Sequence, residues 1–410
     1  MTSPQQSLVI IGNGMATGRL LDEIRSYKSE GFAITVISDE AVGCYNRIML
    51  SSVLAGEASA DTIMLKSAEW YHEQGITLLR EHRVTSIDRT ARRVTCTNGH
   101  SLDYDHLVIA TGSRPATIPA GKQELGNIFS FRTLADTAKI DQAAKTATHA
   151  VVIGGGLLGL EAAYGLAKAG VKVSLVHRSA WLLNRQLDPT AGQLLQASMA
   201  KLGIQFHLGT EVSTFVGEEK VSGAELLNGK VLDAELVVIA TGITPNAELG
   251  KEAGLAGKRG IAVDDYMATD DSAISALGEC VEHRGQTFGL VDPIWDQCRT
   301  LAARLCGGKP QAFSQKPVAT KLKVSGINLF SAGLFLDQDN LDTAHIIDRQ
   351  KGVYRKVLVD KANRIQGAVL FGDVRGGMDY FAMMLDQHIC DISLADIAIA
   401  APKNTAQVDL

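Results

Sequence analysis

The chain has 410 residues, which is enough for two to four domains at roughly 100–200 residues per domain. Its formal net charge of −5 and its pI near 6.1 argue against nucleic-acid or anionic-membrane partners, which need a clustered basic excess. The first apolar run is short and has no basic region before it, and no apolar stretch approaches the roughly 20 residues of a membrane span. We therefore expect a cytoplasmic protein without a signal peptide.

The first predicted elements are a strand, a glycine-rich turn and a helix. The apolar residues 8–11 run directly into the turn, and a helical pattern of apolar residues follows it through Ile24. Glycines in such a turn let the backbone approach a pyrophosphate at the helix N-terminus. We expect a dinucleotide to bind here, at Gly12, Asn13, Gly14, Met15 and Ala16. The third glycine position of the fingerprint holds Thr17, so an ordinary strand-to-helix turn stays an alternative.

A second strand over residues 33–37 ends at two acidic residues, Asp39 and Glu40. A carboxylate at this position of a dinucleotide-binding unit accepts hydrogen bonds from a ribose. We therefore count both residues among the cofactor-binding candidates.

The same pattern recurs in a more complete form around residue 154. The strand 151–153 precedes a turn with all three fingerprint glycines, and a further strand follows at 171–176. The candidate binding residues are Gly154, Gly156, Leu157, Leu158 and Gly159. Two dinucleotide sites need two dinucleotides, and FAD with NADH or NADPH is the natural pair because a flavin can accept the nicotinamide hydride.

Two near-identical strand ends flank the second turn: HLVIATG at 106–112 and ELVVIATG at 235–242. In a doubly wound sheet such ends face the ligand crevice. We expect the cofactors to lie beside Ala110, Thr111, Gly112, Ala240, Thr241 and Gly242. The alternative is that these segments are only buried strands followed by turns.

Six cysteines are scattered along the chain at positions 44, 96, 280, 298, 306 and 390. They show no C-x-x-C or C-x₄-C spacing, so we expect no structural disulfide, metal site or iron–sulfur cluster. Any redox cofactor must then be organic.

Several further motifs resemble those of a known family. They are CYNRIMLS at 44–51, RQLD at 185–188, GECVEHRGQTFGLV at 278–291, PIWDQ at 293–297 and ATKLKV at 319–324. Together with the two glycine turns they resemble the flavoproteins with two dinucleotide-binding domains that include rubredoxin, ferredoxin and disulfide reductases. Within that family the chain is most similar to the NAD(P)H-oxidising modules of assimilatory nitrite and nitrate reductases, over roughly residues 6–390.

The resemblance implies an α/β fold with two Rossmann-like domains and a small α+β C-terminal domain. The FAD-binding domain would comprise residues 1–113 and 243–309, interrupted by an NAD(P)-binding domain at 114–242, with the C-terminal domain at 310–410. Independently, residues 356–359 and 365–371 alternate around a turn at 361–364, which predicts an antiparallel hairpin. The C-terminal domain would cover the flavin or form a subunit contact, so a homodimer is possible.

The resemblance also assigns roles to individual residues around the flavin. Arg47 would contact the flavin pyrophosphate, with a surface salt bridge as the alternative, and Glu279 after Gly278 would bind the ribityl hydroxyls. Relatives carry a lysine at the position of Ser52, which can pair with the glutamate equivalent to Glu161; here that pair cannot form. Glu161 and Trp295 are candidate catalytic residues beside the flavin, although an aromatic residue at the start of a helix, such as Trp295, more often belongs to the core.

The choice of nicotinamide depends on the residues that end the strand at 173–176. NADH-selective folds usually carry an acid there, whereas this chain has His177 and Arg178, which favours NADPH and leaves dual use open. Cys44 lies near the redox cysteine of disulfide reductases, but the alignment on Arg47 and Leu50 would put that cysteine near Ile48. We therefore expect a structural role for Cys44.

The expected reaction is hydride transfer from NAD(P)H to FAD, followed by electron delivery to a partner. The partner implied is a nitrate or nitrite reductase catalytic subunit or a small iron–sulfur carrier, because this chain lacks the grouped cysteines of iron–sulfur and sirohaem modules. The chain would then act as an electron-input module that does not reduce nitrite by itself. Alternatives are a rubredoxin or ferredoxin reductase, an NADH oxidase or disulfide reductase, and a non-catalytic flavin-binding factor.

Overall fold

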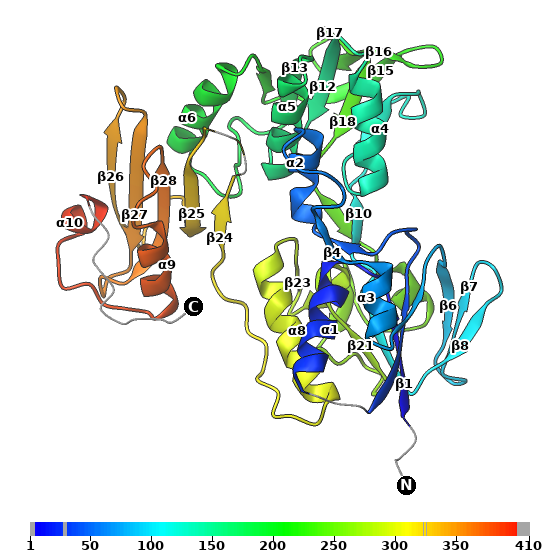
Figure 1. Ribbon diagram of the computed structural model, residues 1–410. Helices are drawn as coiled ribbons and strands as arrows, with labels where there is room; N and C mark the ends of the chain where they lie inside the picture. The colour runs from blue at the N-terminus through cyan, green and yellow to red at the C-terminus, as the bar shows by residue number, and fades with distance from the viewer. Residues whose placement is uncertain (1–4, 28–30, 323, 325, 400–410) are drawn as a thin grey trace. The chain divides into compact units, whose positions relative to one another are not determined.

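The computed structural model describes residues 5–27, 31–322, 324 and 326–399. Lys323 of the 319–324 motif and the ends of the predicted first and last domains lie outside the described residues. The chain forms two compact units (Figure 1). Unit 1 contains Met1–Met49, Ser59–Arg114 and Ile243–Gln315, and unit 2 contains Leu50–Ala58, Pro115–Gly242 and Lys316–Leu410. The predicted domain limits remain a proposal.

Unit 1 is built on a five-stranded parallel sheet. Its strands, in spatial order, are β21 (Ile274–Ala276), β9 (His106–Ile109), β1 (Gln6–Ile11), β2 (Phe32–Ile37) and β5 (Thr77–Leu79). The predicted strand runs 8–11 and 107–109 are buried here, as in parallel sheets covered on both faces, whereas only Val36 and Ile37 of the run 33–37 are buried. Helices α1 (Met15–Ser26) and α8 (Val291–Leu305) lie side by side and pack against each other (Figure 1).

Short elements complete unit 1. The strands are β3 (Cys44–Tyr45), β4 (Met64–Lys66), β6 (Val84–Asp88), β7 (Arg93–Cys96), β8 (Ser101–Asp103), β19 (Ile243–Pro245), β20 (Ile261–Val263), β22 (Val281–His283), β23 (Gln286–Thr287) and β10 (Ser113–Pro115), the last residue of which belongs to unit 2. The helices are η1 (Arg47–Met49), α3 (Ala68–Glu73), α7 (Glu248–Glu252) and η2 (Gly278–Cys280).

Unit 2 contains a second parallel sheet of the same kind. Its strands, in spatial order, are β11 (Ile128–Ser130), β18 (Leu236–Ile239), β12 (His149–Ile153), β13 (Lys172–His177) and β14 (Gln205–Leu208). Its helices are α2 (Leu50–Leu54), α4 (Leu134–Ala144), α5 (Leu157–Lys168) and α6 (Pro189–Ala200), and α2 packs against α5. An antiparallel sheet of β15 (Val212–Gly217), β16 (Val221–Leu226) and β17 (Val231–Asp233) adjoins them.

The C-terminal part of unit 2 is an antiparallel sheet with two helices. Its strand order is β24 (Ala319–Lys321), β25 (Leu329–Gly333), β28 (Ile365–Phe371), β27 (Val353–Val359) and β26 (Asp342–Asp348). Helices α9 (Gly377–Leu385) and α10 (Leu394–Ile399) bury their apolar side chains against it. The predicted hairpin is confirmed, because β27 pairs antiparallel with β28. The predicted fold class, two parallel α/β sheets and a C-terminal α+β part, is confirmed as well.

Within the described ranges, no helix is both long and apolar enough to cross a membrane. The same residues contain no group of three or more His, Cys, Asp or Glu side chains that could hold a metal ion.

Candidate functional site

The first glycine turn joins β1 to α1 in unit 1. Gly12 has φ +106°, and a Cβ atom there would lie 2.2 Å from the carbonyl oxygen of Ala110 at the end of β9. Only glycine therefore lets the chain pass this strand end. Gly14 precedes α1 and has no side chain that could cap the helix. The N–H groups of the first turn, which begins with Met15 and Ala16, therefore donate no capping hydrogen bond to a side chain of this residue. A turn of this form suits a phosphate group, which those N–H groups can bind.

Thr17 occupies the position where the fingerprint has a third glycine. Its hydroxyl donates a hydrogen bond of 2.7 Å to the carbonyl oxygen of Gly12, and the side chain is fully buried. The departure from the fingerprint thus fastens the turn to the helix, and it leaves the close approach of Gly12 to Ala110 intact.

Asn13, in the middle of this turn, has one half of its amide bound and the other half available. The Tyr71 hydroxyl donates to Asn13 Oδ1 over 2.5 Å, and burial raises the pKa of Tyr71, so the hydroxyl stays protonated. Asn13 Nδ2 is buried and has no hydrogen-bond partner among the described residues. An orphaned donor of this kind is costly unless it is satisfied, and an acceptor atom bound in the turn would satisfy it. The turn therefore fits an anionic group.

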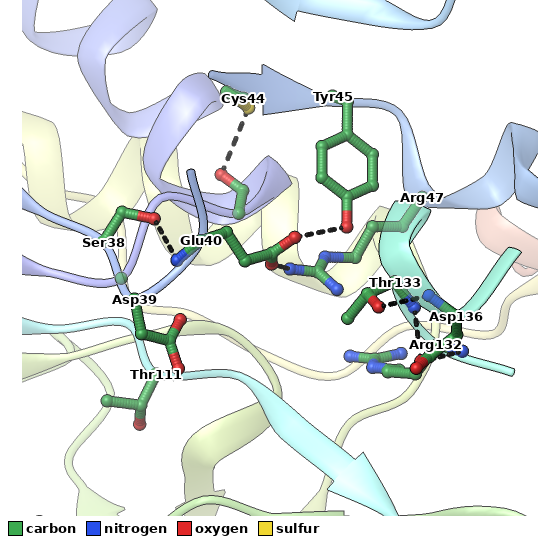
Figure 2. Close-up of polar contacts among 12 residues, drawn as sticks. Ser38, Asp39, Glu40, Cys44, Tyr45, Arg47, Thr111, Arg132, Thr133 and Asp136 are labelled. Atoms are coloured by element: carbon green, nitrogen blue, oxygen red, sulfur yellow. Dashed lines mark hydrogen bonds and ion pairs between the residues drawn. The ribbon is translucent and has the colours of Figure 1, made fainter. Parts of the chain in front are cut away.

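Glu40 and Asp39, the acidic residues after β2, point to different partners. Figure 2 shows the Glu40 carboxylate between Tyr45 and Arg47; the Tyr45 hydroxyl donates to it over 2.8 Å, and the Arg47 guanidinium forms an ion pair with it. Asp39 instead pairs with Arg83 over 2.7 Å, where both side chains are largely exposed. Of the two predicted carboxylates, Glu40 is the one that belongs to a half-buried polar cluster.

Arg47 is held in this cluster by several groups at once. Its guanidinium lies 5.0 Å from the centre of the Tyr45 ring. Burial opposes the charged form, but Tyr45, Glu40 and Glu279 outweigh it and raise the pKa of Arg47. The guanidinium is therefore a permanent positive charge, partly withdrawn from water, with geometry that suits a phosphate.

Glu279 and Gly278 lie beside the first turn. Gly278 has φ +89°, and a Cβ atom there would lie 3.3 Å from the Cβ of Ala16. Its N–H donates to Gln297 Oε1 over 2.8 Å. Ser113 donates to Glu279 Oε2 over 3.0 Å, so the carboxylate is oriented by a residue that directly follows the ATG strand end.

The strand end at Ala110, Thr111 and Gly112 is fixed by hydrogen bonds to Asn246. The Thr111 hydroxyl donates to the Asn246 carbonyl over 2.7 Å, and Asn246 Nδ2 donates to the Thr111 carbonyl over 3.0 Å. The Asn246 N–H completes the set by donating to the Gly112 carbonyl over 2.9 Å. The two ATG strand ends were predicted to face cofactors; here the first one is fixed by a residue that follows the second.

Trp295 lies on α8 and packs partly against the core of unit 1. The Arg19 guanidinium is 5.8 Å from the centre of its ring. In the same helix, the Cys298 thiol donates to the carbonyl oxygen of Ala16 over 3.3 Å, so α8 touches the glycine turn directly. These contacts fit the core alternative for Trp295, and its role beside a flavin remains a proposal.

Cys44 is fully buried, and its thiol donates to the carbonyl oxygen of Gly14 over 3.4 Å. A Cβ atom on Gly18 would lie 2.7 Å from the Cys44 sulfur, so the thiol packs tightly against α1. Burial raises the pKa of this thiol to about 11. A buried thiol that stays protonated is a poor nucleophile, which agrees with the expected structural role.

The second glycine turn, in unit 2, repeats the geometry of the first. Gly154 has φ +121°, and a Cβ atom there would lie 2.3 Å from the carbonyl oxygen of Ala240. A Cβ atom on Gly159 would lie 2.0 Å from the Gly154 carbonyl oxygen, so the third glycine is required here for close packing. Gly156 precedes α5, which begins at Leu157 and Leu158, again without a side-chain cap. The second ATG end continues through Thr241 and Gly242, both exposed.

His177 and Arg178 differ in what they contact. His177 Nδ1 accepts a hydrogen bond from the Gly155 N–H over 3.1 Å, and Nε2 lies 3.2 Å from Asn184 Oδ1. This arrangement needs a neutral ring. Burial lowers the pKa of His177, which also favours the neutral ring. The Arg178 side chain is exposed. The positive charge at this strand end therefore comes from Arg178.

Ser52 and Glu161 lie on two helices of unit 2 that pack together, α2 and α5. Ser52 is half-buried, and its carbonyl oxygen accepts from the N–H groups of Glu57 and Ala58. Glu161 is 7 % exposed, which is unusual for a carboxylate.

Some residues of the two sites escaped sequence reasoning. Tyr71 and Asn246 reach the first turn and its strand end from positions far away in the chain, and Ser113 contacts the distant Glu279. Asn184 was part of no recognised motif. Tyr45 lies inside the CYNRIMLS motif, so its position next to Arg47 was a usable signal.

Comparisons with known proteins agree with this geometry. The family model described as pyridine nucleotide-disulphide oxidoreductase matches residues 6–297, and the one described as rubredoxin NAD⁺ reductase C-terminal domain matches residues 317–388. The nitrite reductase [NAD(P)H] of Bacillus subtilis is 41% identical over 97% of this chain, and the assimilatory nitrate reductase electron transfer subunit of the same organism is 39% identical over 98%.

The match covers 49% and 52% of those two relatives, so the chain spans about half of their length. Among solved structures, a covalent putidaredoxin reductase–putidaredoxin complex superimposes with a TM-score of 0.84 and 28% identity, over 93% of both chains. The family model covers well over half of the sequence. The chain therefore belongs to the pyridine nucleotide-disulphide oxidoreductase family.

Proposed function

We propose that the chain binds FAD at the first glycine turn and NADH or NADPH at the second, and that it passes electrons from the nicotinamide through FAD to a redox partner. The observation that carries this proposal is the duplication of one unusual geometry. A Cβ atom added to Gly12 would lie 2.2 Å from the carbonyl oxygen of Ala110, and one added to Gly154 would lie 2.3 Å from that of Ala240. In dinucleotide-binding folds a turn of this geometry is the place where the pyrophosphate binds at the helix N-terminus.

In unit 1, the first turn and Arg47 would hold the flavin pyrophosphate, with Asn13 Nδ2 as an additional donor. Glu40 would bind the adenosine ribose, and Glu279, oriented by Ser113, would bind the ribityl hydroxyls. When bound, the flavin takes a hydride from the nicotinamide and can release electrons one at a time. The chain's own contribution is to position the cofactors, which needs no acid or base among these residues.

In unit 2, the second turn would hold the pyrophosphate of the nicotinamide nucleotide. Arg178 is an exposed cation beside that turn and suits a 2′-phosphate, so we favour NADPH and keep NADH as a second donor. Replacing Arg178 with alanine should raise the KM for NADPH about tenfold and leave the KM for NADH unchanged. An equal change for both nucleotides would remove the basis for the NADPH preference.

For the acceptor, we propose a catalytic subunit of nitrate or nitrite reduction. The names of the two Bacillus subtilis relatives support this choice, since both are matched along almost all of this chain. A rubredoxin or ferredoxin reductase is a second candidate, favoured by the match of residues 317–388 to the C-terminal domain of rubredoxin reductases.

One experiment separates these acceptors. The protein is reduced anaerobically with NADPH and then mixed either with the catalytic part of a nitrate or nitrite reductase or with a rubredoxin. Reoxidation by the first at a rate that sustains turnover is the expected result. Reoxidation only by rubredoxin would favour the second candidate, and reoxidation by neither would contradict both.

A further inference from the structure

Unit 2 contains a buried polar network that the nucleotide chemistry does not require. Its centre is Asp188, which is 4 % exposed and caps α6 by accepting from the Ala191 N–H over 2.9 Å. From β27, the Tyr354 hydroxyl donates to Asp188 Oδ2 over 2.6 Å, and Lys356 Nζ lies 3.2 Å from the same oxygen. Lys356 also pairs with Asp337 over 3.0 Å. A buried carboxylate tolerates little displacement from donors of this kind.

Asp188 ends a short segment, residues 181–188, which we call the strap. The C-terminal sheet holds the strap at a second point, because the Ser331 hydroxyl on β25 donates to the Gln186 carbonyl over 2.5 Å. Strands β25 and β27 thus bind two strap residues, one through a hydroxyl and one through a hydroxyl and an ammonium group. One end of the strap is therefore attached to the C-terminal sheet.

The other end of the strap is attached to the second glycine turn. The Leu183 N–H donates to the Gly155 carbonyl over 2.9 Å, and Asn184 contacts the His177 ring, which itself accepts from the Gly155 N–H. A Cβ atom on Gly155 would lie 2.7 Å from the His177 ring and 2.9 Å from Leu182. Both peptide groups of Gly155, between the fingerprint glycines 154 and 156, are therefore fixed by the strap or by a side chain that the strap orients.

The strap is largely buried and is held together by internal hydrogen bonds. Leu182, Leu183 and Leu187 are buried to 1 % exposure or less. The Leu183 carbonyl accepts from the N–H groups of Gln186 and Leu187, each over 2.8 Å, and the Trp181 ring N–H donates to the Leu187 carbonyl over 2.8 Å. A displacement at Asp188 has few ways to relax inside this segment, so it would reach Gly155.

We propose that the C-terminal sheet positions the nicotinamide-binding turn through the strap, with Tyr354, Ser331 and Asn184 as positioning residues for NAD(P)H. This inference rests on the proposed binding of NAD(P)H at the second turn. It gives the C-terminal part a role in the affinity for the electron donor, in addition to any role near the flavin or at a subunit contact.

The main test is Tyr354→Phe, which removes one hydroxyl and keeps the ring. The KM and Kd for NADPH should rise about threefold or more, since a hydrogen bond to a buried charge is lost. The turnover rate at saturating NADPH should stay within about twofold, and the flavin content should not change. Ser331→Ala acts on the other attachment point and should raise the KM in the same way.

Tyr380→Phe is the matched control. Tyr380 is also a fully buried tyrosine of the C-terminal part, and its hydroxyl donates to the Ile397 carbonyl, away from the strap. This variant should lose stability to a similar degree and keep the KM of the parent protein. In addition, Asn184→Ala combined with Tyr354→Phe should raise the KM less than the product of the two single effects, because both act through one strap.

Several results would overturn the inference. It is wrong if Tyr354→Phe and Ser331→Ala raise the KM for NADPH no more than Tyr380→Phe does. It is also wrong if the KM increase of the Asn184→Ala/Tyr354→Phe double variant equals the product of the two single increases. It is also wrong if the turnover rate and the flavin content of the variants fall as their KM rises, since parallel losses indicate a general structural defect. A parent protein that saturates with neither NADH nor NADPH would instead refute the proposed function on which the inference rests.

Discussion

The two glycine turns show how one backbone solution is completed by different side chains. In both, a glycine with positive φ passes the end of a neighbouring strand. A Cβ atom added to that glycine would lie within 2.3 Å of the carbonyl oxygen at this strand end. The second turn closes by packing Gly159 directly on Gly154, whereas the first closes through a hydrogen bond from Thr17 to Gly12. The backbone geometry is thus common to both turns. At the third fingerprint position, either a glycine that packs closely or a threonine that donates a hydrogen bond can close the turn.

The turns differ more in the groups that follow the next strand. Beside the first turn, Glu40 is bound by Tyr45 and Arg47 in a charged cluster (Figure 2). Beside the second, His177 is neutral and supports Gly155, while Arg178 is exposed. We propose that this difference separates a site for a permanently held flavin from a site for an exchanging nicotinamide, and four experiments test the proposal.

The largest effects are expected from adding one methyl group to each turn. Gly12→Ala should abolish flavin binding, and Gly154→Ala should keep the flavin but abolish its reduction by NAD(P)H. Each Cβ would collide with a carbonyl oxygen at a positive φ, which costs about 3 kcal/mol or more, or roughly a hundredfold in affinity. Bound flavin and NADPH titration measure the two outcomes.

Gly75→Ala and Gly229→Ala are matched controls for these changes. Both glycines have positive φ, yet a Cβ atom would meet nothing within 4 Å. They should cost some stability and leave both cofactors bound. If Gly12→Ala and Gly154→Ala had the same consequence for flavin, the assignment of one nucleotide to each turn would be wrong.

Replacing Arg47 should produce the next largest effect. Arg47→Leu should weaken flavin binding about 10- to 100-fold, because hydrogen bonds to a charged group contribute about 1.5–3 kcal/mol. Arg83→Leu removes the exposed pair with Asp39 and should have no such effect. Flavin dissociation constants from equilibrium dialysis compare the two variants. Equal, small effects would mean that Arg47 forms only a structural ion pair with Glu40.

A smaller effect is expected at the third position of the first turn. Thr17→Val removes the hydroxyl that binds Gly12 and should lower flavin affinity about fivefold, in line with about 1 kcal/mol for one hydrogen bond. Thr17→Ser keeps the hydroxyl and should bind flavin as the parent does. Loss of affinity in the serine variant but not in the valine variant would show that packing, not the hydrogen bond, holds the turn.

The smallest effect is a pH dependence at His177. Burial lowers its pKa below the ordinary value of 6.5, so the folded ring stays neutral while the unfolded ring takes up a proton. The free energy of unfolding should therefore fall as the pH drops below 6.5, and the KM for NADPH should rise when the folded ring finally protonates and no longer accepts from Gly155. His177→Gln should remove most of this dependence. A KM profile that is identical in the variant would exclude His177 as its source.

The sequence allowed the two turns, their strand ends and the C-terminal hairpin to be predicted, because each depends on residues that are close in the chain. Gly12, Gly154 and the ATG repeats carry a local backbone requirement that a pattern reveals. The contact between Tyr71 and Asn13 joins residues 58 positions apart, and that between Ser113 and Glu279 joins residues 166 apart. Such contacts depend on how the strands are ordered in the sheet, which single-residue patterns do not encode.

His177 illustrates a second reason. Its position at the strand end was predictable, but a histidine there can be a cation or a neutral acceptor. The choice is made by the Gly155 N–H and by Asn184, and the latter directly precedes the RQLD motif without being part of it. The electrostatic role of a titratable side chain thus depends on tertiary contacts that form only in the folded chain.

The central claim, that the two turns hold two different nucleotides, has a direct test. The purified protein is examined for bound flavin and then mixed anaerobically with NADPH or NADH while its visible absorbance is followed. We expect a yellow protein with one FAD per chain, whose colour is lost on mixing with at least one of the nucleotides. A colourless protein that does not take up FAD, or a yellow protein that neither nucleotide bleaches, would contradict it.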